Sequence, residues 1–387
     1  MKARFLASLF CLVLVSCQTQ KLTKEHELIP EQLRTPSSNE ETSIDASLGE
    51  KRFANEENTF QDIVRVISNF SSRRFSEGRT PALRDAHAKS HGCVRANFHV
   101  ENNLTQDLAR GVFVPGKDYK ALIRYSNGGP EPLPDSKGDA RGMAIKLLGV
   151  KGPKILSEER NAETQDFVMI NHPAFFVNDP TTYLKFITAF HRPGFLESKT
   201  AAVHLGIHKA WLALKISSSK IEHPLQAQYW SMTPYQLGAG SGKKAIKFTA
   251  KPCSISGPQL PDKKDPDFLQ HAMVDTLSTG SACFNFYVQI YKNPDDTPIE
   301  DSTVVWKEEV SPLQKVATIT IPRQNFNSPS QMTDCENLSF TPWHALHDHK
   351  PLGAINRTRR VVYSAISKLR HQLNRVPRQE PTGLESF

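Results

Sequence analysis

The sequence predicts an α+β domain in which helices flank a predominantly antiparallel sheet or barrel. Short strand-like runs separated by Gly, Pro and Asp fill much of the chain from residue 120 to residue 321. Helical periodicity appears near residue 60, between residues 180 and 216, and near the C-terminus. Because few short βα alternations occur, a doubly wound parallel sheet is not expected.

The first residues are typical of an export signal. Lys2 and Arg4 precede an apolar run over residues 5–15, which is too short to cross the ~30 Å hydrocarbon core of a membrane. The sequence LVSC ends at Cys17 and resembles the lipobox of bacterial lipoprotein precursors. We therefore expect a signal peptide over residues 1–16 and an acylated Cys17 that anchors an exported protein in the bacterial envelope, at the periplasmic face of the outer membrane. An ordinary secretory signal is the alternative.

The organisation of the remaining chain follows from its composition and periodicity. Residues 17–58 are polar and lack apolar periodicity, which predicts a flexible tether. The globular domain is expected over residues 59–378, with a short tail over residues 379–387. Strands are predicted at residues 120–125, 142–148, 167–170, 245–250, 283–291, 304–308 and 316–321.

The composition, with 38% hydrophobic residues and a net charge of +8, is that of a globular protein. Lys and Arg are mostly interspersed with acidic residues, so a nucleic-acid partner is not expected. In an oxidising compartment the four cysteines beyond Cys17 could form up to two disulfides, and all three full pairings of Cys93, Cys253, Cys283 and Cys335 stay open. The oligomeric state is not predicted.

A helix expected near the C-terminus, RTRRVVYSAISKLRHQLN, carries an unusual polar stripe. Arg359, Tyr363 and Arg370 stand at positions i, i+4 and i+11 and therefore share one face. A nearby cation favours a phenolate, which can ligate a metal. A core tyrosine beside two solvated arginines fits the same spacing.

His87 is a second candidate for a functional residue. It stands close to Arg84 and His91, and a histidine can accept and return a proton near neutral pH. A zinc site is not expected, because Ala88 replaces the glutamate of an HExxH motif.

Four segments, taken in order, resemble the haem catalases. RDAHAKS at residues 84–90 is similar to the distal R-x-x-H-A-K-G segment, and ALIRYSNGG with DARGMAIKL resembles the two strands that follow it. DFVMINHPAFFVNDP at residues 166–180 resembles the D-L-x-x-N-N-x-P-x-F-F-x-x-D-P segment. The pattern R-x3-Y-x6-R at residues 359–370 matches the proximal helix.

This resemblance implies a catalase-like antiparallel β-barrel with flanking helices that hold haem b. It makes Tyr363 the proximal ligand of the haem iron and His87 the distal base. The other cofactor-binding residues that it implies are Arg84, Arg124, Ser126, Phe176, Tyr183, Arg359 and Arg370. It further implies a haem-dependent oxidoreductase of the catalase or peroxidase type that breaks down hydrogen peroxide.

The chain departs from the family pattern at the distal asparagine. In ungapped register that residue falls on Ile170, and Asn171 is its neighbour, so Asn171 is a tentative catalytic residue. Two alternatives stay open for this reason. The first is an enzyme for organic or fatty acid hydroperoxides, similar to allene oxide synthases, and the second is a non-catalytic haem-binding protein of the envelope.

Overall fold

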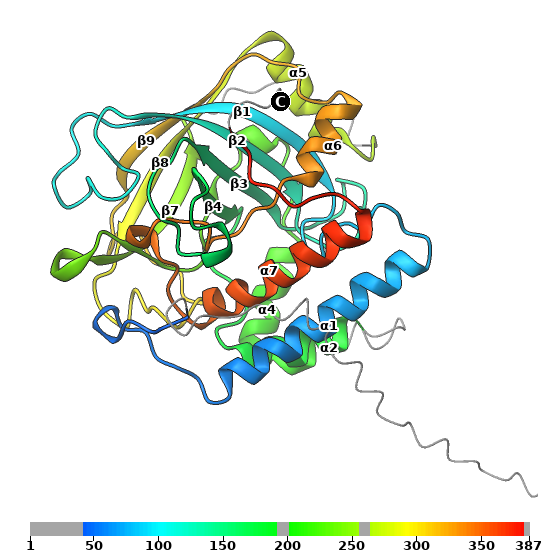
Figure 1. Cartoon of the computed structure of the whole chain (residues 1–387), viewed down its shortest axis with the longest axis horizontal. Helices are drawn as coiled ribbons and strands as arrows, with labels where there is room; N and C mark the ends of the chain where they lie inside the picture. Colours follow the sequence, from blue (N-terminus) through cyan, green and yellow to red (C-terminus); the bar gives the residue numbers. More distant parts are fainter. Residues whose placement is uncertain (1–41, 192–200, 255–263, 383–387) are drawn as a thin grey trace, which may run out of the picture.

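In the described parts of the chain, nine antiparallel strands form one sheet that closes on itself (Figure 1). The computed structural model describes residues 42–191, 201–254 and 264–382. The strands are β1 (Ser90–Val100), β2 (Asp118–Asn127), β3 (Arg141–Leu148), β4 (Thr164–Ile170), β5 (Tyr229–Trp230), β6 (Tyr235–Leu237), β7 (Lys244–Pro252), β8 (Ala282–Ile290) and β9 (Gln314–Ile321). The order β5-β4-β3-β2-β1-β9-β8-β7 returns to β5, so eight strands close a barrel and β6 pairs with β7 beside it. The predicted antiparallel barrel is confirmed.

The inside of the barrel is a packed core. Because successive side chains of a strand point to opposite faces, alternate residues fill the interior. Phe167 lies at its centre, with ring centroids 5.1 Å from both Phe248 and Phe286. On β2, Ile123 and Tyr125 point into this core, whereas Arg124 and Ser126 take the outward positions between and beyond them. The outer surface of the barrel is therefore where β2 presents its polar residues.

Helices cover that outer surface. They are α1 (Glu56–Ser76), α2 (Pro180–Phe190), α4 (Ile207–Ser217), α5 (Phe268–Thr279), α6 (Pro329–Asn337) and α7 (Ala354–Asn374). Figure 1 shows α1, α2, α4 and α7 gathered on one side of the barrel. Apolar side chains of α1 and α7 pack together, including Ile63, Ile67 and Val362. None of the described helices is long and apolar enough to cross a membrane.

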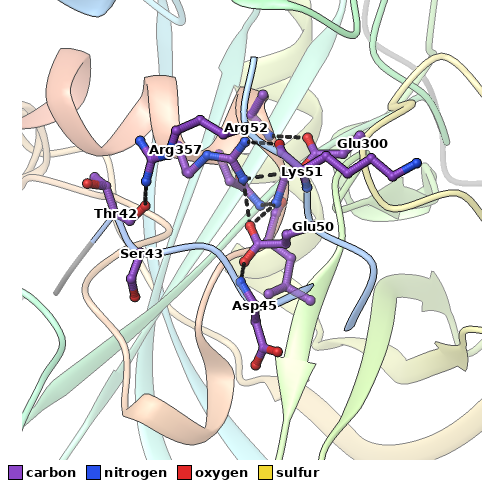
Figure 2. A network of polar contacts seen from close by, with 12 residues as sticks. Thr42, Ser43, Asp45, Glu50, Lys51, Arg52, Glu300 and Arg357 are labelled. Carbon is purple, nitrogen blue, oxygen red and sulfur yellow. Dashed lines mark hydrogen bonds and ion pairs between the residues drawn. The ribbon is translucent and has the colours of Figure 1, made fainter. Parts of the chain in front are cut away.

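The segment before α1 packs against the domain instead of forming a free tether. Glu50 accepts hydrogen bonds from Arg357 of α7, at 2.7 Å, and from the amide of Gly353, at 2.8 Å (Figure 2). Glu56 and Glu300 also accept from the Arg357 guanidinium, which is fully buried. This packing corrects the expected boundary at residue 59, because Glu50 already belongs to the folded domain. The signal peptide and Cys17 lie outside the described residues.

The structure also differs from the predicted strand at residues 304–308 and from the predicted tail at residues 379–387. Residues 304–308, predicted as a strand, are irregular, because their carbonyls accept from side chains: Val304 from Lys247 and Trp306 from Gln289. The expected tail from residue 379 contributes Glu380, whose carboxylate accepts a hydrogen bond of 2.6 Å from buried Lys146.

The four cysteines form two disulfides. Cys93 of β1 is bonded to Cys335 of α6, and Cys253 beyond β7 is bonded to Cys283 of β8. Of the three pairings that the sequence left open, the structure has this one. The first disulfide ties α6 to the barrel wall.

Candidate active site

A cavity of about 600 Å³ lies between the outer face of β2, β3 and β4 and the helices α2, α4 and α7. This volume is within the range of about 300–1,000 Å³ that is typical of cofactor and ligand pockets. Nine of the residues proposed from the sequence line this cavity: His87, Arg84, Arg124, Ser126, Phe176, Tyr183, Arg359, Tyr363 and Arg370. Residues that are far apart in the sequence, from Arg84 to Arg370, therefore meet at one site.

Backbone and side-chain contacts hold His87 in an unusual conformation. Its φ is 61°, a left-handed value that is uncommon for residues other than glycine. Its amide donates to the carbonyl of Gly128 at 2.9 Å, and its own carbonyl accepts from Arg124 at 2.9 Å. Asp139 in turn accepts hydrogen bonds from the amide of Gly128 and fixes that turn. Strained backbone that the surroundings over-determine in this way is common at functional sites.

The imidazole ring of His87 is oriented by Ser126. Nδ1 of His87 lies 3.0 Å from Oγ of Ser126, within hydrogen-bond distance. Burial, and after it the nearby Arg124 cation, lowers the pKa of His87 to about 3. The ring is therefore neutral across the physiological range and is free to accept a proton.

Gly142 leaves the room that His87 and Ser126 occupy. A Cβ atom at residue 142 would lie 2.6 Å from Nδ1 of His87 and 2.7 Å from Oγ of Ser126. Real Cβ atoms essentially never approach heavy atoms this closely. The glycine of the DARGMAIKL segment is thus a steric requirement of the His87 position.

Three arginines, Arg84, Arg124 and Arg370, form a charged wall of the cavity and share one carboxylate partner. Glu336 at the end of α6 forms ion pairs with Arg84, with Arg124 at 3.4 Å and with Arg370 at 3.6 Å. Burial raises the pKa of Glu336, but the three cations outweigh it and hold this pKa below its ordinary value. Burial and the neighbouring Arg84 lower the pKa of both Arg124 and Arg370 to about 9. Three guanidinium groups and one carboxylate leave a local charge of +2.

Arg359 lies over the ring of Tyr363, as their shared helix face predicts. The guanidinium carbon is 5.0 Å from the ring centroid. Burial alone would lower the pKa of Arg359, but Tyr363 and Tyr235 raise it above the ordinary value. Nη1 donates to Asn356 at 3.1 Å, whereas the buried Nη2 has no hydrogen-bond partner among the described residues. This cation is placed to stabilise a phenolate at Tyr363.

Apolar side chains make up most of the remaining lining. Phe175 and Phe176 stand with ring centroids 4.7 Å apart, and Tyr183 lies 6.4 Å from Phe176. Asp85 lines the same cavity, 3.3 Å from Nε2 of His191, and burial raises the pKa of the Asp85 carboxyl to about 7. Water is thus largely replaced by hydrocarbon around His87.

Asn171 does not line the cavity, which corrects its tentative catalytic role. Its Oδ1 accepts from the amide of Arg141 at 2.6 Å, and its Nδ2 donates to Ser219 at 2.9 Å. Ile170 lines the cavity instead. The amide of Asn171 is thus engaged by Arg141 and Ser219 and not by the cavity.

Sequence reasoning missed Glu336, Gly142 and Asp85. Glu336 lies far from its arginines in sequence, and Gly142 acts by lacking a side chain, so neither gives a local signal. Asp85 stands two residues before His87, and this proximity was the available sign.

Comparison with known proteins agrees with this geometry. The catalase family model matches residues 55–205. Catalase-2 of Bacillus subtilis (strain 168) is 25% identical over 359 residues, which are 83% of this chain and 48% of that protein. The catalase of Latilactobacillus sakei is 25% identical over 301 residues, which cover 72% of this chain and 59% of that protein. This chain is similar to the catalases.

Solved catalases share the fold of this catalase-like chain. A fungal catalase crystal structure superposes with a TM-score of 0.58 at 17% identity, over 78% of this chain and 62% of that one. Catalase A from Saccharomyces cerevisiae gives a TM-score of 0.57 at 19% identity, over 78% and 65% of the two chains. The chain spans about half the length of the Bacillus relative.

The cavity of this catalase-like chain fits the haem that the superfamily binds. Its local charge of +2 at the arginine wall equals the charge needed to neutralise two propionates. Buried Nε of Arg124 and Nη2 of Arg359 are without hydrogen-bond partners among the described residues. Tyr363 offers an oxygen ligand on one helix, and His87 lies on a separate segment of the wall.

Proposed function

We propose that this catalase-like chain is a haem b enzyme that decomposes hydrogen peroxide in the bacterial cell envelope. The observation that carries the proposal is that His87, held at a left-handed φ, shares one enclosed cavity with Tyr363 and its arginine partner. Tyr363 would ligate the iron, and Arg84, Arg124 and Arg370 would hold the propionates.

Bound haem supplies the redox-active iron at which the O–O bond of a peroxide is broken. The neutral ring of His87 takes a proton from one peroxide oxygen and returns it to the other, which leaves as water. Ser126 orients the ring for both transfers. Arg359 offsets the negative charge of the Tyr363 phenolate. A second hydrogen peroxide would give up two electrons and two protons and leave as dioxygen, so that two peroxides would give two waters and one dioxygen.

A second candidate is the breakdown of organic or fatty acid hydroperoxides. Ile170 takes the cavity position at which the family carries an asparagine, so the distal pocket lacks an amide there. A largely apolar cavity wall also suits a hydrocarbon chain.

One assay separates these functions and the non-catalytic haem carrier. Haem-loaded full-length protein is supplied with hydrogen peroxide or with linoleic acid hydroperoxide, and dioxygen release and peroxide consumption are measured. We expect dioxygen from hydrogen peroxide, and His87→Ala should lower the rate by about 10²–10⁴-fold while haem absorbance is retained. Consumption of the fatty acid hydroperoxide alone supports the second candidate, and no reaction with either supports the carrier.

The envelope location rests on the N-terminal signal and on the cysteines. The two disulfides support an oxidising compartment. Acylation of Cys17 would anchor the protein to a membrane. Fractionation of cells tests this, because Cys17→Ala should release the protein from the membrane fraction, and persistent association after a salt wash would contradict the anchor.

A further inference from the structure

The mouth of the cavity carries a cluster of exposed apolar side chains. Of the nine exposed large hydrophobic residues in the described parts of the chain, five fall between residues 190 and 214. They are Phe190, Val203, Ile207, Trp211 and Leu214, and we call them the mouth patch. Ile207 is 93% exposed and Trp211 is 56% exposed. Such a concentration is unusual for a surface that meets only water.

Helix α4 is apolar on two faces. Leu212 and Ile216 are buried towards the cavity, as on any amphipathic helix. Ile207, Trp211 and Leu214 stand at i, i+4 and i+7 and form a second stripe that faces outward. A helix that is apolar on both faces is expected to be covered on both.

The mouth patch is continuous with the cavity. Phe190 and Leu214 belong both to the exposed cluster and to the cavity lining. Ala210 and Ala213 of α4 also line the cavity. A partner that covers the mouth patch therefore also lies at the entrance of the cavity.

The charge of this region indicates which kind of partner covers the mouth patch. The described residues 201–220 contain no Asp or Glu and include Lys209, Lys215 and Lys220, of which Lys209 pairs with Asp179 of α2's N-terminus at 3.2 Å. The Lys215 ammonium lies 5.3 Å from the ring centroid of Trp211. Tryptophan, aliphatic side chains and lysines on one surface are the combination that binds the headgroup region of anionic membranes.

We propose that the mouth patch docks on an anionic lipid bilayer, so that the cavity opens towards the membrane. This surface is separate from the N-terminal anchor and does not depend on the reaction that the cavity performs. A bilayer at the entrance would give apolar peroxides a direct route to His87.

The test uses the intrinsic fluorescence of Trp211 in the full-length protein. Of the four tryptophans, Trp306 and Trp343 are buried and Trp230 of β5 is half-buried, so Trp211, on the exposed face of α4, is the one that a bilayer reaches most readily. Vesicles of phosphatidylcholine and phosphatidylglycerol with brominated acyl chains should shift the emission to the blue and quench it. Trp211→Phe should abolish most of this quenching while the protein still binds. Pure phosphatidylcholine vesicles should quench much less.

A double variant and a matched control separate the patch from the N-terminal segment. Ile207→Ser with Leu214→Ser should weaken vesicle binding at least about tenfold, because two exposed apolar side chains no longer leave water. Val114→Ser, at an exposed valine away from the cavity, should bind as the parent does. The parent and all variants carry Cys17→Ala, which removes the proposed acyl anchor, and circular dichroism verifies that they fold.

Two results would overturn the proposal. One is the absence of Trp211 quenching by anionic brominated vesicles. The other is equal binding by the parent and the Ile207→Ser/Leu214→Ser variant. Self-association that disappears in the double variant, without vesicle quenching, would instead assign the patch to a second copy of this chain.

Discussion

At the scale of single residues, the position of His87 depends on neighbouring groups as much as on its own side chain. His87, Tyr363 and the arginines could be predicted because their side chains titrate or carry charge at a recognisable spacing. Gly142 could not, because its contribution is the space that a missing Cβ leaves to His87. Glu336 could not either, because its three arginine partners come from distant segments.

Gly142→Ala tests the steric account of the His87 position. The new methyl group must displace the imidazole or Ser126, so peroxide consumption by the haem-loaded protein should fall by about 10²-fold or more. Gly142→Ala combined with His87→Ala should be no slower than His87→Ala alone. The control is Gly242→Ala, whose Cβ would meet only the end of the Arg110 side chain at 3.8 Å. Parental kinetics in Gly142→Ala would refute this account.

At the scale of elements, helical periodicity predicted α7. It did not predict the ion pairs that hold α7 to Glu50 and Glu56. The apolar stripe and the polar face of α7 follow directly from the helical repeat. Residues 17–58 looked like a tether because they are polar, yet Glu50 and Glu56, the first residue of α1, are buried against Arg357. A polar segment and a buried ion-pair partner cannot be distinguished by composition alone.

Arg357→Ala should destabilise the helix that carries Tyr363. Its removal leaves Glu50, Glu56 and Glu300 near one another without their shared cation, which should cost about 3–5 kcal/mol of unfolding free energy. Denaturant unfolding measures the loss. Arg65→Ala is the control, because Arg65 pairs with Asp62 on the surface and should cost less than about 1 kcal/mol. Equal losses in the two variants would contradict the proposed anchoring.

At the scale of the whole molecule, barrel closure could be predicted from the family resemblance but not from the periodicity of the strands. The ring closes through β5, which has only two residues, Tyr229 and Trp230. A run of this length has no measurable periodicity. The antiparallel class was predictable from longer runs such as β8, whereas the order of strands depended on hydrogen bonds between distant segments.

Acid should destabilise the folded protein through its buried histidines. Burial lowers the pKa of His87 and His349 to about 3 and contributes most to lowering that of His91 and His191 to about 4. Between the ordinary pKa of about 6.5 and these values, the unfolded chain binds protons that the folded chain does not, so stability falls as pH falls. Asp85, whose pKa is raised to about 7, acts in the opposite direction and offsets about one histidine.

His349→Gln measures how much His349, which does not line the cavity, contributes to the loss of stability at low pH. His349 accepts a hydrogen bond from the amide of Val112 at 3.0 Å, and a glutamine oxygen can replace that acceptor. The parent should lose about 2 kcal/mol more than the variant when the pH is lowered from 7 to 5, measured by denaturant unfolding at each pH. An identical pH dependence in both proteins would exclude His349 as a contributor.

The central claim is that Tyr363 ligates the haem iron, and the spectrum of the ferric haem tests it most directly. Absorption and electron paramagnetic resonance spectra are compared for the haem-loaded parent, Tyr363→Phe and Tyr183→Phe. Tyr183 lines the same cavity but lies on α2, so its variant controls for the loss of a phenol near the haem. We expect Tyr363→Phe to lose or change the axial ligation and Tyr183→Phe to keep the parental spectrum. An unchanged ferric spectrum in haem-loaded Tyr363→Phe would contradict the account.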